Sequence, residues 1–483
     1  MTRLLTIGKM ALAAVALIVL TIYFVLAFNA RNRPSLGPEH RIHFAAEFEA
    51  SQEDEIDWAA YLEIEDQLAV ELEEALATAQ RPVSLVDRYS PDSLTYPGNF
   101  DGNWNRSYEI HAPSPRGVAV LLHGLTDSPY SMLATAETLV ANGYSVVVPR
   151  MPGHGFAVGA MLQTRWEDWS AAVRVAMRHA QSLPGAEQSL LLGGYSNGGL
   201  LAVHYALECD ERDGLNCPDG LVLLSPSINV SQLAILTNLH AGVSWLPYFE
   251  QFKWQTVLPE IDPFKFTSFP KRAAWEIRRI LSQTHAQLAD PTEIAKLPPI
   301  LTFQSAVDDT VSPSAIVTLL YNRLPAGNNR LVVYGVNSNN TLLHLMRSNP
   351  PNPAALFQSM APLEFDAVVL QNHDDVGRTV DAWMLLASAS AATTEHLAYA
   401  WPDDVFSLSH IALPFRPDDL VYGDGARPES QGRIALGALA PRGERRVMRL
   451  NAEYFLRMRH NPFYGFQQAQ LVEWLGHLEN PGD

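Results

Sequence analysis

The chain has 483 residues, of which 47% are hydrophobic and 18% are charged, so it can form one large or two ordinary globular domains. Its 52 acidic and 34 basic side chains give a formal net charge of -18, and no Lys/Arg-rich run offsets the excess. Because neutralising phosphates requires clustered cations, this composition argues against a nucleic-acid partner.

The N-terminal segment is strongly apolar. Met10 to Phe28 is a run of 19 residues without a charge, and as a helix it spans about the hydrocarbon thickness of a bilayer. A cleaved signal peptide has a shorter apolar run and a small-x-small cleavage site, so we favour an uncleaved single-pass membrane anchor over residues 1–30. Basic residues flank the run on both sides, and their count does not decide the orientation.

Residues 31–90 form an acidic segment. Positions 42–80 contain twelve Asp or Glu and no Lys or Arg. Apolar residues recur at helical spacing from Ile56 to Leu76, which predicts an amphipathic helix that is capped by Ser51 and ends at Arg81-Pro82. Its acidic face could dock on the folded body, hold a partner or be solvated.

From about residue 105 the pattern changes to short apolar runs separated by helical stretches: GVAVLLHG, YSVVVPRMPGHG, SLLLGGYSNGG, DGLVLLSPSI and PPILTFQSAVDD. Strands that alternate with helices predict an α/β fold with a mostly parallel sheet and helices on both faces. We expect residues 91–228 and 299–483 to form the two halves of this core. Functional loops then lie at the carboxyl ends of the strands.

Residues 229–298 separate two of these strands and are too long for a simple loop, which predicts an inserted lid subdomain. The segment is rich in aromatic residues, which could line an apolar pocket but by default hold the insertion together. They are Trp245, Tyr248, Phe249, Phe252, Trp254, Phe264, Phe266, Phe269 and Trp275.

Two cysteines, Cys209 and Cys217, lie eight positions apart in a helix-to-strand loop. The spacing permits a small disulfide loop, which requires an oxidising compartment, and two reduced thiols are the alternative. Together with the anchor, the disulfide alternative favours a periplasmic or otherwise extracytoplasmic body.

The strongest chemical signal is Gly194-Tyr195-Ser196-Asn197-Gly198, which stands between an apolar run and an Ala/Leu-rich helix. Gly-x-Ser-x-Gly in this context is typical of a nucleophile elbow, a sharp turn that exposes the serine hydroxyl. We therefore expect Ser196 to be a nucleophile. A glycine-rich turn without chemistry is the alternative.

A nucleophilic serine needs an oxyanion hole. VAVLLHGLTDS ends an apolar run at His123-Gly124, so the backbone N–H of Leu125 is expected to act together with that of Asn197. His123 is expected to stabilise the loop rather than act as a base.

These motifs, with RMPGHG at Arg150–Gly155 and SAVDDTV, resemble α/β-hydrolases of the monoacylglycerol-lipase and serine-aminopeptidase type over about residues 105 to 320. The resemblance implies a Ser, acid, His order along the chain. Family members carry Gly-x-x-Asp-x-x-Val at the acid, and Ser305-x-x-Asp308-x-x-Val311 fits with serine in place of glycine. Asp308 is therefore preferred over Asp309, and either could instead cap a turn or helix.

The base departs from the family pattern, because no histidine follows the next strand. His344 lies in the apolar stretch NTLLHLM, which favours a packed helix, and His373 precedes two aspartates, which favours an exposed turn. His410 in VFSLSHIALPF follows a short strand-like run and precedes an irregular loop. Choosing His410 requires an insertion of several tens of residues between acid and base, which is thermodynamically cheap at the surface.

The sequence thus predicts a serine carboxylesterase or lipase with the triad Ser196, Asp308 and His410, acting on a small-molecule or lipid ester. A peptidase or amidase of the same fold is an alternative, with Glu250, Glu260, Asp262 and Glu276 as candidate acidic contacts, and a noncatalytic scaffold is another. We expect no cofactor and no metal, since no closely spaced His/Cys cluster is apparent. The oligomeric state is not predicted.

Overall fold

The computed structural model describes residues 2–79, 84–211, 214–230, 247–374, 376–426, 433–440, 442, 449–450 and 452–479. The α-helices are α1 (Thr2–Arg31), α2 (Trp58–Ala77), α3 (Leu133–Ala141), α4 (Trp166–Ala180), α5 (Asn197–Glu208), α6 (Lys271–Leu288), α7 (Pro291–Ile294), α8 (Pro313–Ala315), α9 (Pro353–Met360), α10 (Ala452–Leu456) and α11 (Tyr464–Glu479). The strands are β1 (Tyr108–Ile110), β2 (Gly117–Leu122), β3 (Tyr144–Val148), β4 (Leu190–Tyr195), β5 (Gly220–Leu224), β6 (Trp254–Thr256), β7 (Phe269–Pro270), β8 (Ile300–Ser305), β9 (Arg330–Tyr334), β10 (Asp366–Asn372), β11 (Thr379–Leu385) and β12 (Thr393–Ala400).

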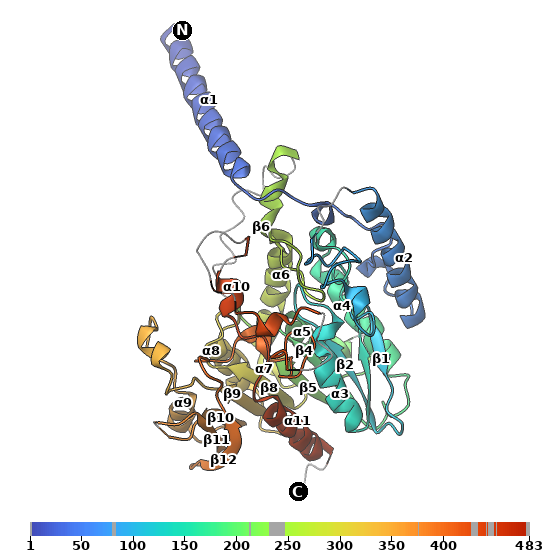
Figure 1. The fold of residues 1–483 in the computed structure, drawn as a ribbon, viewed down its shortest axis with the longest axis vertical. Coiled ribbons are helices and arrows are strands. Elements are labelled where there is room, and N and C mark those ends of the chain that lie inside the picture. Colours follow the sequence, from blue (N-terminus) through green and yellow to red (C-terminus); the bar gives the residue numbers. More distant parts are fainter. Residues whose placement is uncertain are drawn as a thin grey trace.

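One large sheet organises the body of the molecule (Figure 1), and its described strands run in the order β1-β3-β2-β4-β5-β8-β9-β10-β11-β12. The strands from β3 to β10 pair in parallel, and β1, β11 and β12 are antiparallel additions at the edges. Strands β2, β3, β4, β5, β8 and β9 are buried along their whole length. Burial on both faces explains why they read as continuous apolar runs rather than alternating ones.

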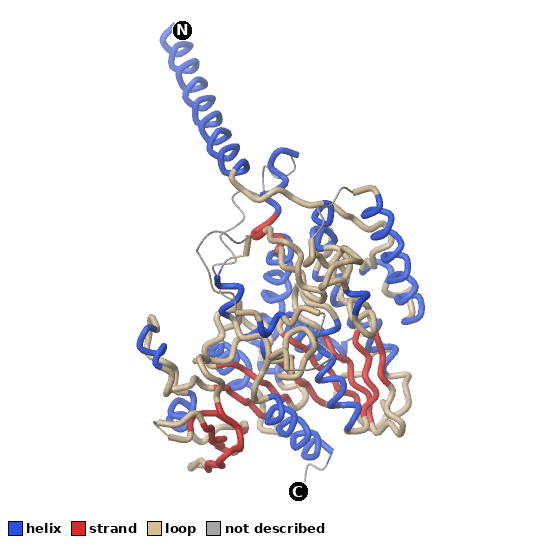
Figure 2. Tube along the Cα trace, viewed as in Figure 1, coloured by secondary structure: helices blue, strands red, loops and turns tan. Residues whose placement is uncertain are grey.

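The two faces of the sheet are covered by different helices. Helices α4, α5, α6 and α9 contribute to the apolar cluster on one face, and α3 and α11 contribute to the cluster on the other. The predicted α/β architecture with a mostly parallel sheet is confirmed. Figure 2 shows long loops gathered between this sheet and the base of α1.

Helix α1 extends away from the body (Figure 1). Its span Thr6–Arg31 is long and apolar enough to cross a membrane, and the side chains of its apolar stretch are not buried inside the protein. The C-terminal part of α1 touches the body: Tyr23 packs edge-on against Phe249, and Ala30 is buried against Phe249 and Phe252. Just after the helix, the Arg33 guanidinium donates to the carbonyl of Trp254 at 2.8 Å. The base of α1 therefore rests on the segment that precedes α6.

The acidic helix docks on the body, and it begins later than predicted. Ser51 lies in a separate short 3-10 turn, and the cap is Asp57, whose carboxylate accepts from the N–H of Ala60 at 2.9 Å. Inside α2, Glu65 is fully buried and forms an ion pair with Arg150 at 3.3 Å. The predicted end of the helix at Arg81-Pro82 lies outside the described residues. Within the described residues, α2 ends at Ala77.

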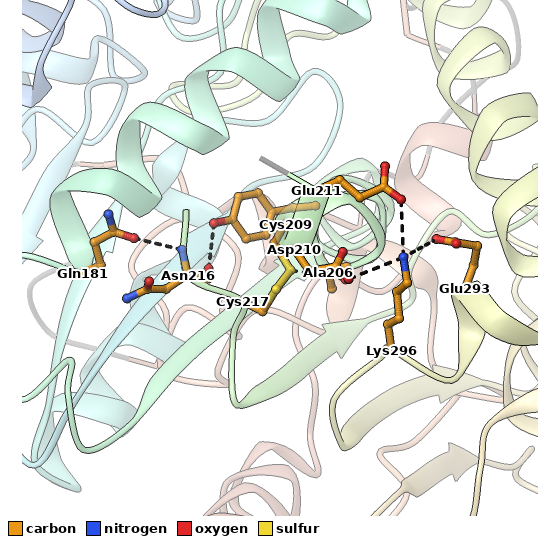
Figure 3. Close-up of a disulfide and its surroundings, with 10 residues drawn as sticks. Gln181, Ala206, Cys209, Asp210, Glu211, Asn216, Cys217, Glu293 and Lys296 are labelled. Carbon is orange, nitrogen blue, oxygen red and sulfur yellow. Dashed lines mark hydrogen bonds and ion pairs between the residues drawn. A yellow bond between two sulfur atoms is a disulfide. The ribbon is translucent and has the colours of Figure 1, made fainter. Parts of the chain in front are cut away.

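Cys209 and Cys217 form a disulfide immediately after α5 (Figure 3), which decides between the two alternatives left open by the spacing. The loop is also held by the Tyr205 hydroxyl, which donates to the carbonyl of Asn216 at 2.9 Å. The end of helix α5 that bears the disulfide is the one opposite Ser196.

Between Asp308 and His410 the chain adds strands at the sheet edge. Strands β10, β11 and β12 extend the sheet beyond β9, with α9 packed against them. Because β10 occupies the free edge of β9, the segment before His410 cannot join the sheet. It makes only the isolated bridge Val336–Ser407, so its predicted strand-like character is wrong.

Candidate active site

Ser196 stands on a sharp turn between β4 and α5. Its backbone has φ 55° and ψ -113°, a conformation that costs energy for a residue with a side chain. Glycines make the turn possible: a Cβ at position 198 would lie 2.1 Å from the carbonyl oxygen of Leu122, and one at position 194 would lie 2.3 Å from the backbone carbon of Gly198. The Gly-x-Ser-x-Gly pattern therefore reflects close backbone packing.

The structure brings the three sequence-predicted side chains into one hydrogen-bonded line. His410 Nε2 lies 3.1 Å from Ser196 Oγ, and His410 Nδ1 lies 2.7 Å from Asp308 Oδ2. All three residues are buried, although they are far apart in the sequence. Such a line can pass a proton from the hydroxyl to the imidazole while the carboxylate fixes the ring orientation.

Asp308 is held as a carboxylate. Its Oδ1 accepts from the N–H groups of Thr310 and Val311 at 2.8 and 2.9 Å, and Gln304 donates to Oδ2 at 3.2 Å. Burial alone would raise the pKa of Asp308, but His410 and these backbone donors together lower it below its ordinary value. Asp309 is exposed, and Asp308 is the aspartate that meets the histidine.

Two serines anchor the segment that carries His410. The Ser305 hydroxyl, at the end of β8, donates to the carbonyl of Leu408 at 2.7 Å, and the Ser409 hydroxyl donates to the carbonyl of Met458. Ser305 is fully buried. The serine that replaces the family glycine thus ties the strand before the acid to the loop that holds the imidazole.

The other histidines that the sequence offered for the base do not line the cavity. His344 is exposed in a short 3-10 helix, so the prediction of a packed histidine is wrong: its apolar neighbours Leu342 and Leu345 are exposed too. His373 hydrogen-bonds with Asp381 at 2.9 Å. His123 is buried and accepts from the N–H of Met151 at 2.9 Å, and burial keeps its pKa well below the ordinary value.

The expected oxyanion donors lie on either side of the elbow. Leu125 follows β2, and Asn197 is the first residue of α5, where the helix cannot satisfy its own N–H groups. The contact between position 198 and the end of β2 brings these two backbone segments together. Their arrangement is compatible with two donors for an anionic oxygen next to Ser196.

Ser227 was not anticipated from the sequence. Its hydroxyl lies 3.2 Å from Ser196 Oγ, and it follows β5, the strand next to β4. No local pattern pointed to Ser227, whereas Asp308 was chosen from the spacing Ser305-x-x-Asp308-x-x-Val311. Ser227 offers the Ser196 hydroxyl a second hydrogen-bond partner.

A cavity of about 570 Å³ opens over Ser196 and His410. The segment 229–298, which was predicted to form a lid, contributes apolar side chains to the cavity wall. They are Phe269 and, from α6, Ala274, Ile277 and Leu281. The other insertion aromatics that the structure describes do not line it. Trp245 lies outside the described residues, and Phe249, Phe252, Trp254, Phe264 and Phe266 are buried in packing contacts instead.

A partly buried ion pair joins the core to the segment 229–298 beside the cavity. Lys265 Nζ lies 2.8 Å from Asp127 Oδ1, and both residues line the cavity wall. Burial raises the pKa of the Asp127 carboxyl, and Lys265 offsets part of this effect. The pair fixes residues after β2 against the insertion, next to the expected oxyanion donor Leu125.

The sheet order and the elbow after β4 are those of an α/β-hydrolase fold. Residues 113–336 match the model of the family described as serine aminopeptidase, S33. A thermostable monoacylglycerol lipase from Bacillus sp. (strain H-257) is 28% identical over 199 residues, which is 41% of this chain and 73% of that enzyme. Over part of its length the chain is thus similar to hydrolases that include a monoacylglycerol lipase.

The solved structures to which the chain is similar include lipolytic enzymes. One is from a study of the metagenome-derived enzymes LipS and LipT (23% identity, 45% of this chain, 82% of that chain, TM-score 0.36). Another is a monoacylglycerol lipase from Paleococcus ferrophilus (18% identity, 47% of this chain, 88% of that chain, TM-score 0.35). A third is a carboxyl esterase from Bacillus coagulans in complex with glycerol (15% identity, 44% and 79%, TM-score 0.34).

Proposed function

We propose that this protein is a serine esterase that hydrolyses carboxylic esters of the acyl-lipid type through Ser196, His410 and Asp308. The observation that carries the proposal is the continuous hydrogen-bonded line from Ser196 Oγ through His410 to Asp308 at the floor of a cavity. A serine hydroxyl needs such a base to attack a carbonyl at neutral pH.

In the proposed mechanism His410 Nε2 takes the Ser196 proton as Oγ attacks the ester carbonyl. Asp308 accepts a hydrogen bond from Nδ1–H and stabilises the imidazolium cation that forms. The N–H groups of Leu125 and Asn197 bind the oxyanion. His410 then gives its proton to the departing alcohol, and water activated by the same ring releases the acid from the acyl-enzyme.

The cavity wall favours an ester over a peptide with a free amino terminus. The four acidic residues considered as ammonium contacts are not among the lining residues: Glu250 pairs with Arg41, Glu276 with Arg272 and Arg279, Asp262 accepts from Tyr422, and Glu260 accepts from backbone N–H groups. The described lining contains two carboxylates, Asp127 and Asp309, against the cations Lys265, Arg278 and Arg457. A positively biased wall repels an ammonium group.

Helix α1 supports a substrate drawn from a membrane. Its base rests on the segment just before α6, and the wall of the cavity is built partly from α6. With α1 as a single-pass anchor, the segment 229–298 lies near the membrane surface and acts as the lid through which an acyl chain enters. The disulfide supports an extracytoplasmic body, because such bonds persist in oxidising compartments.

The test uses the full-length protein in detergent. We expect labelling of Ser196 by a fluorophosphonate and hydrolysis of monoacylglycerols and aryl esters, with no comparable turnover of aminoacyl anilides. Ser196→Ala lowers kcat/KM on the order of 10⁴-fold or more and abolishes labelling, whereas the exposed Ser338→Ala changes neither. Faster turnover of aminoacyl anilides than of esters would support the peptidase alternative, and an unlabelled wild-type protein would support the noncatalytic scaffold.

A further inference from the structure

Three metal-ligating side chains meet on the antiparallel extension of the sheet, away from the residues that line the Ser196 cavity. His373 directly follows β10, Asp381 lies in β11 and His396 lies in β12. Asp381 and His396 are direct partners in the β11–β12 register, and the N–H of His373 donates to the carbonyl of Thr379 at 2.9 Å. The backbone of three adjacent strands therefore fixes the spacing of the group.

The donor atoms have the spacing of a coordination shell. His373 Nδ1 and His396 Nδ1 each lie 2.9 Å from the same oxygen, Asp381 Oδ1, and a ligand atom from each of the three residues lies within 4.8 Å of the others. Around a metal with bonds of about 2.0–2.1 Å, neighbouring ligand atoms are about 3.0–3.4 Å apart. The three side chains are thus close to the positions that they would take around one ion.

The chemistry of the group suits a borderline transition metal. Two imidazoles and one carboxylate are ligands that Zn²⁺ accepts, and an oxygen-only shell would be expected for Mg²⁺ or Ca²⁺. The Asp381 side chain is only 10% exposed, while those of His373 and His396 are 47% and 55% exposed. The carboxylate is therefore held in place by the sheet, and solvent can supply the remaining ligands.

Hydrogen bonding alone gives a weaker account of the group. Two solvent-exposed imidazoles would both have to carry the proton on Nδ1 and direct it at the same carboxylate, which His373 meets through both oxygens and His396 through Oδ1, although water competes for each ring. A cation shared by all three side chains accounts for their convergence with the imidazoles neutral and the carboxylate ionised.

We propose that His373, Asp381 and His396 form a binding site for one Zn²⁺-class divalent ion, which crosslinks β10, β11 and β12. The ion would hold the outermost strand, β12, against the sheet. The residues lie eight and fifteen positions apart, which is why their sequence spacing gave no metal motif. The proposal is independent of the esterase assignment, because none of the three residues lines the Ser196 cavity.

The experiment uses full-length, tag-free protein in detergent after treatment with a chelator. Titration with Zn²⁺ in a calorimeter is expected to show one equivalent bound, and Co²⁺ in its place is expected to give visible absorption bands from a low-symmetry site. Zn²⁺ should also raise Tm, because it binds the folded chain. His396→Ala and His373→Ala should weaken binding about tenfold or more and remove the Tm shift.

His344→Ala is the matched control, because it removes an exposed histidine outside the group. It should bind Zn²⁺ as the wild type does. Asp381→Asn keeps the side-chain shape and removes the charge, so it should abolish the Co²⁺ bands while the fold persists by circular dichroism. A wild-type protein that binds no Zn²⁺, or one whose binding is unchanged in both His373→Ala and His396→Ala, would overturn the proposal.

Discussion

Ser305 occupies the position where the related family has glycine. The hydrogen bond that its hydroxyl makes explains why serine stands there. It reaches the carbonyl of Leu408, two residues before His410, while Asp308 follows three residues after Ser305. A glycine would leave that buried carbonyl without this donor. The departure from the family pattern thus compensates for a histidine segment that is not part of a strand.

We predict that Ser305→Ala slows catalysis without weakening substrate binding. Losing one hydrogen bond of this kind is expected to cost about 0.5–1.5 kcal/mol, so kcat should fall about two- to tenfold with KM unchanged. The measurement is steady-state hydrolysis of an aryl ester together with the rate of fluorophosphonate labelling. Ser338→Ala serves as the control, and a rise in KM with constant kcat would contradict a positioning role.

Among the single residues of the site, those that lie in short sequence motifs could be predicted from the sequence. Ser196 and Asp308 each sit in a short pattern beside an apolar strand, and Leu125 follows one. His410 could be chosen only by weighing three histidines against chain order. Ser227 and the partner of Ser305 are contacts between distant segments, which no local pattern contains.

Among the elements, α2 and its buried ion pair join the N-terminal segment to the core. Arg150 is fully buried, and its guanidinium bonds to Glu65, to Glu47 and to the carbonyls of Met151 and His154. Burial acts to lower the pKa of Arg150, but the two carboxylates raise it above its ordinary value, so the side chain stays charged. The loop RMPGHG, the carboxyl end of β3 and the acidic helix therefore fold as one unit.

We predict that Arg150→Met destabilises the protein by about 3–5 kcal/mol, because it leaves Glu65 and Glu47 buried without their cation. Urea unfolding followed by tryptophan fluorescence measures the change. Lys296→Ala removes exposed ion pairs with Asp210, Glu211 and Glu293 (Figure 3) and should change the stability much less. Equal losses in the two variants would show that Arg150 is not a structural link.

Strands were predicted more accurately than the start of α2 or the segment before His410. An apolar run buried on both faces has a distinctive composition, whereas Ser51 and Asp57 are both good caps and only tertiary packing selects the second. The segment VFSLSH has strand-like composition, but β10 takes the edge that it would need. Which segment pairs with the free edge of β9 depends on the whole topology, so it cannot be predicted from the six residues VFSLSH.

At the scale of the whole molecule, α1 is the candidate membrane anchor of the proposed esterase. We predict that deletion of residues 2–31 releases the protein from carbonate-washed membranes into the soluble fraction, with hydrolysis of soluble aryl esters retained and hydrolysis of membrane-embedded esters reduced. A helix of 26 residues at 1.5 Å per residue exceeds the roughly 30 Å of the bilayer core. Fractionation and activity on both substrate types measure the outcome.

Mass spectrometry of the full-length protein tests the same helix independently. An intact N-terminus in the membrane fraction is expected for an anchor. A mature chain that begins after α1 and is found in the soluble fraction would identify α1 as a cleaved signal sequence instead.

The hydrogen bond between Ser305 and Leu408 also has a consequence for how this chain can diversify. The stretch between acid and base leaves the site after Asp308 and returns at the bond, so its two ends are fixed. It includes the buried strands β9 and β10, and its outermost strand, β12, lies at the edge of the sheet with mostly exposed side chains. We expect changes in length at β12 to leave the distance between Asp308 and His410 unchanged. The sheet edge is thus a position where residues can be added, in evolution or by design, while the geometry of the site is preserved.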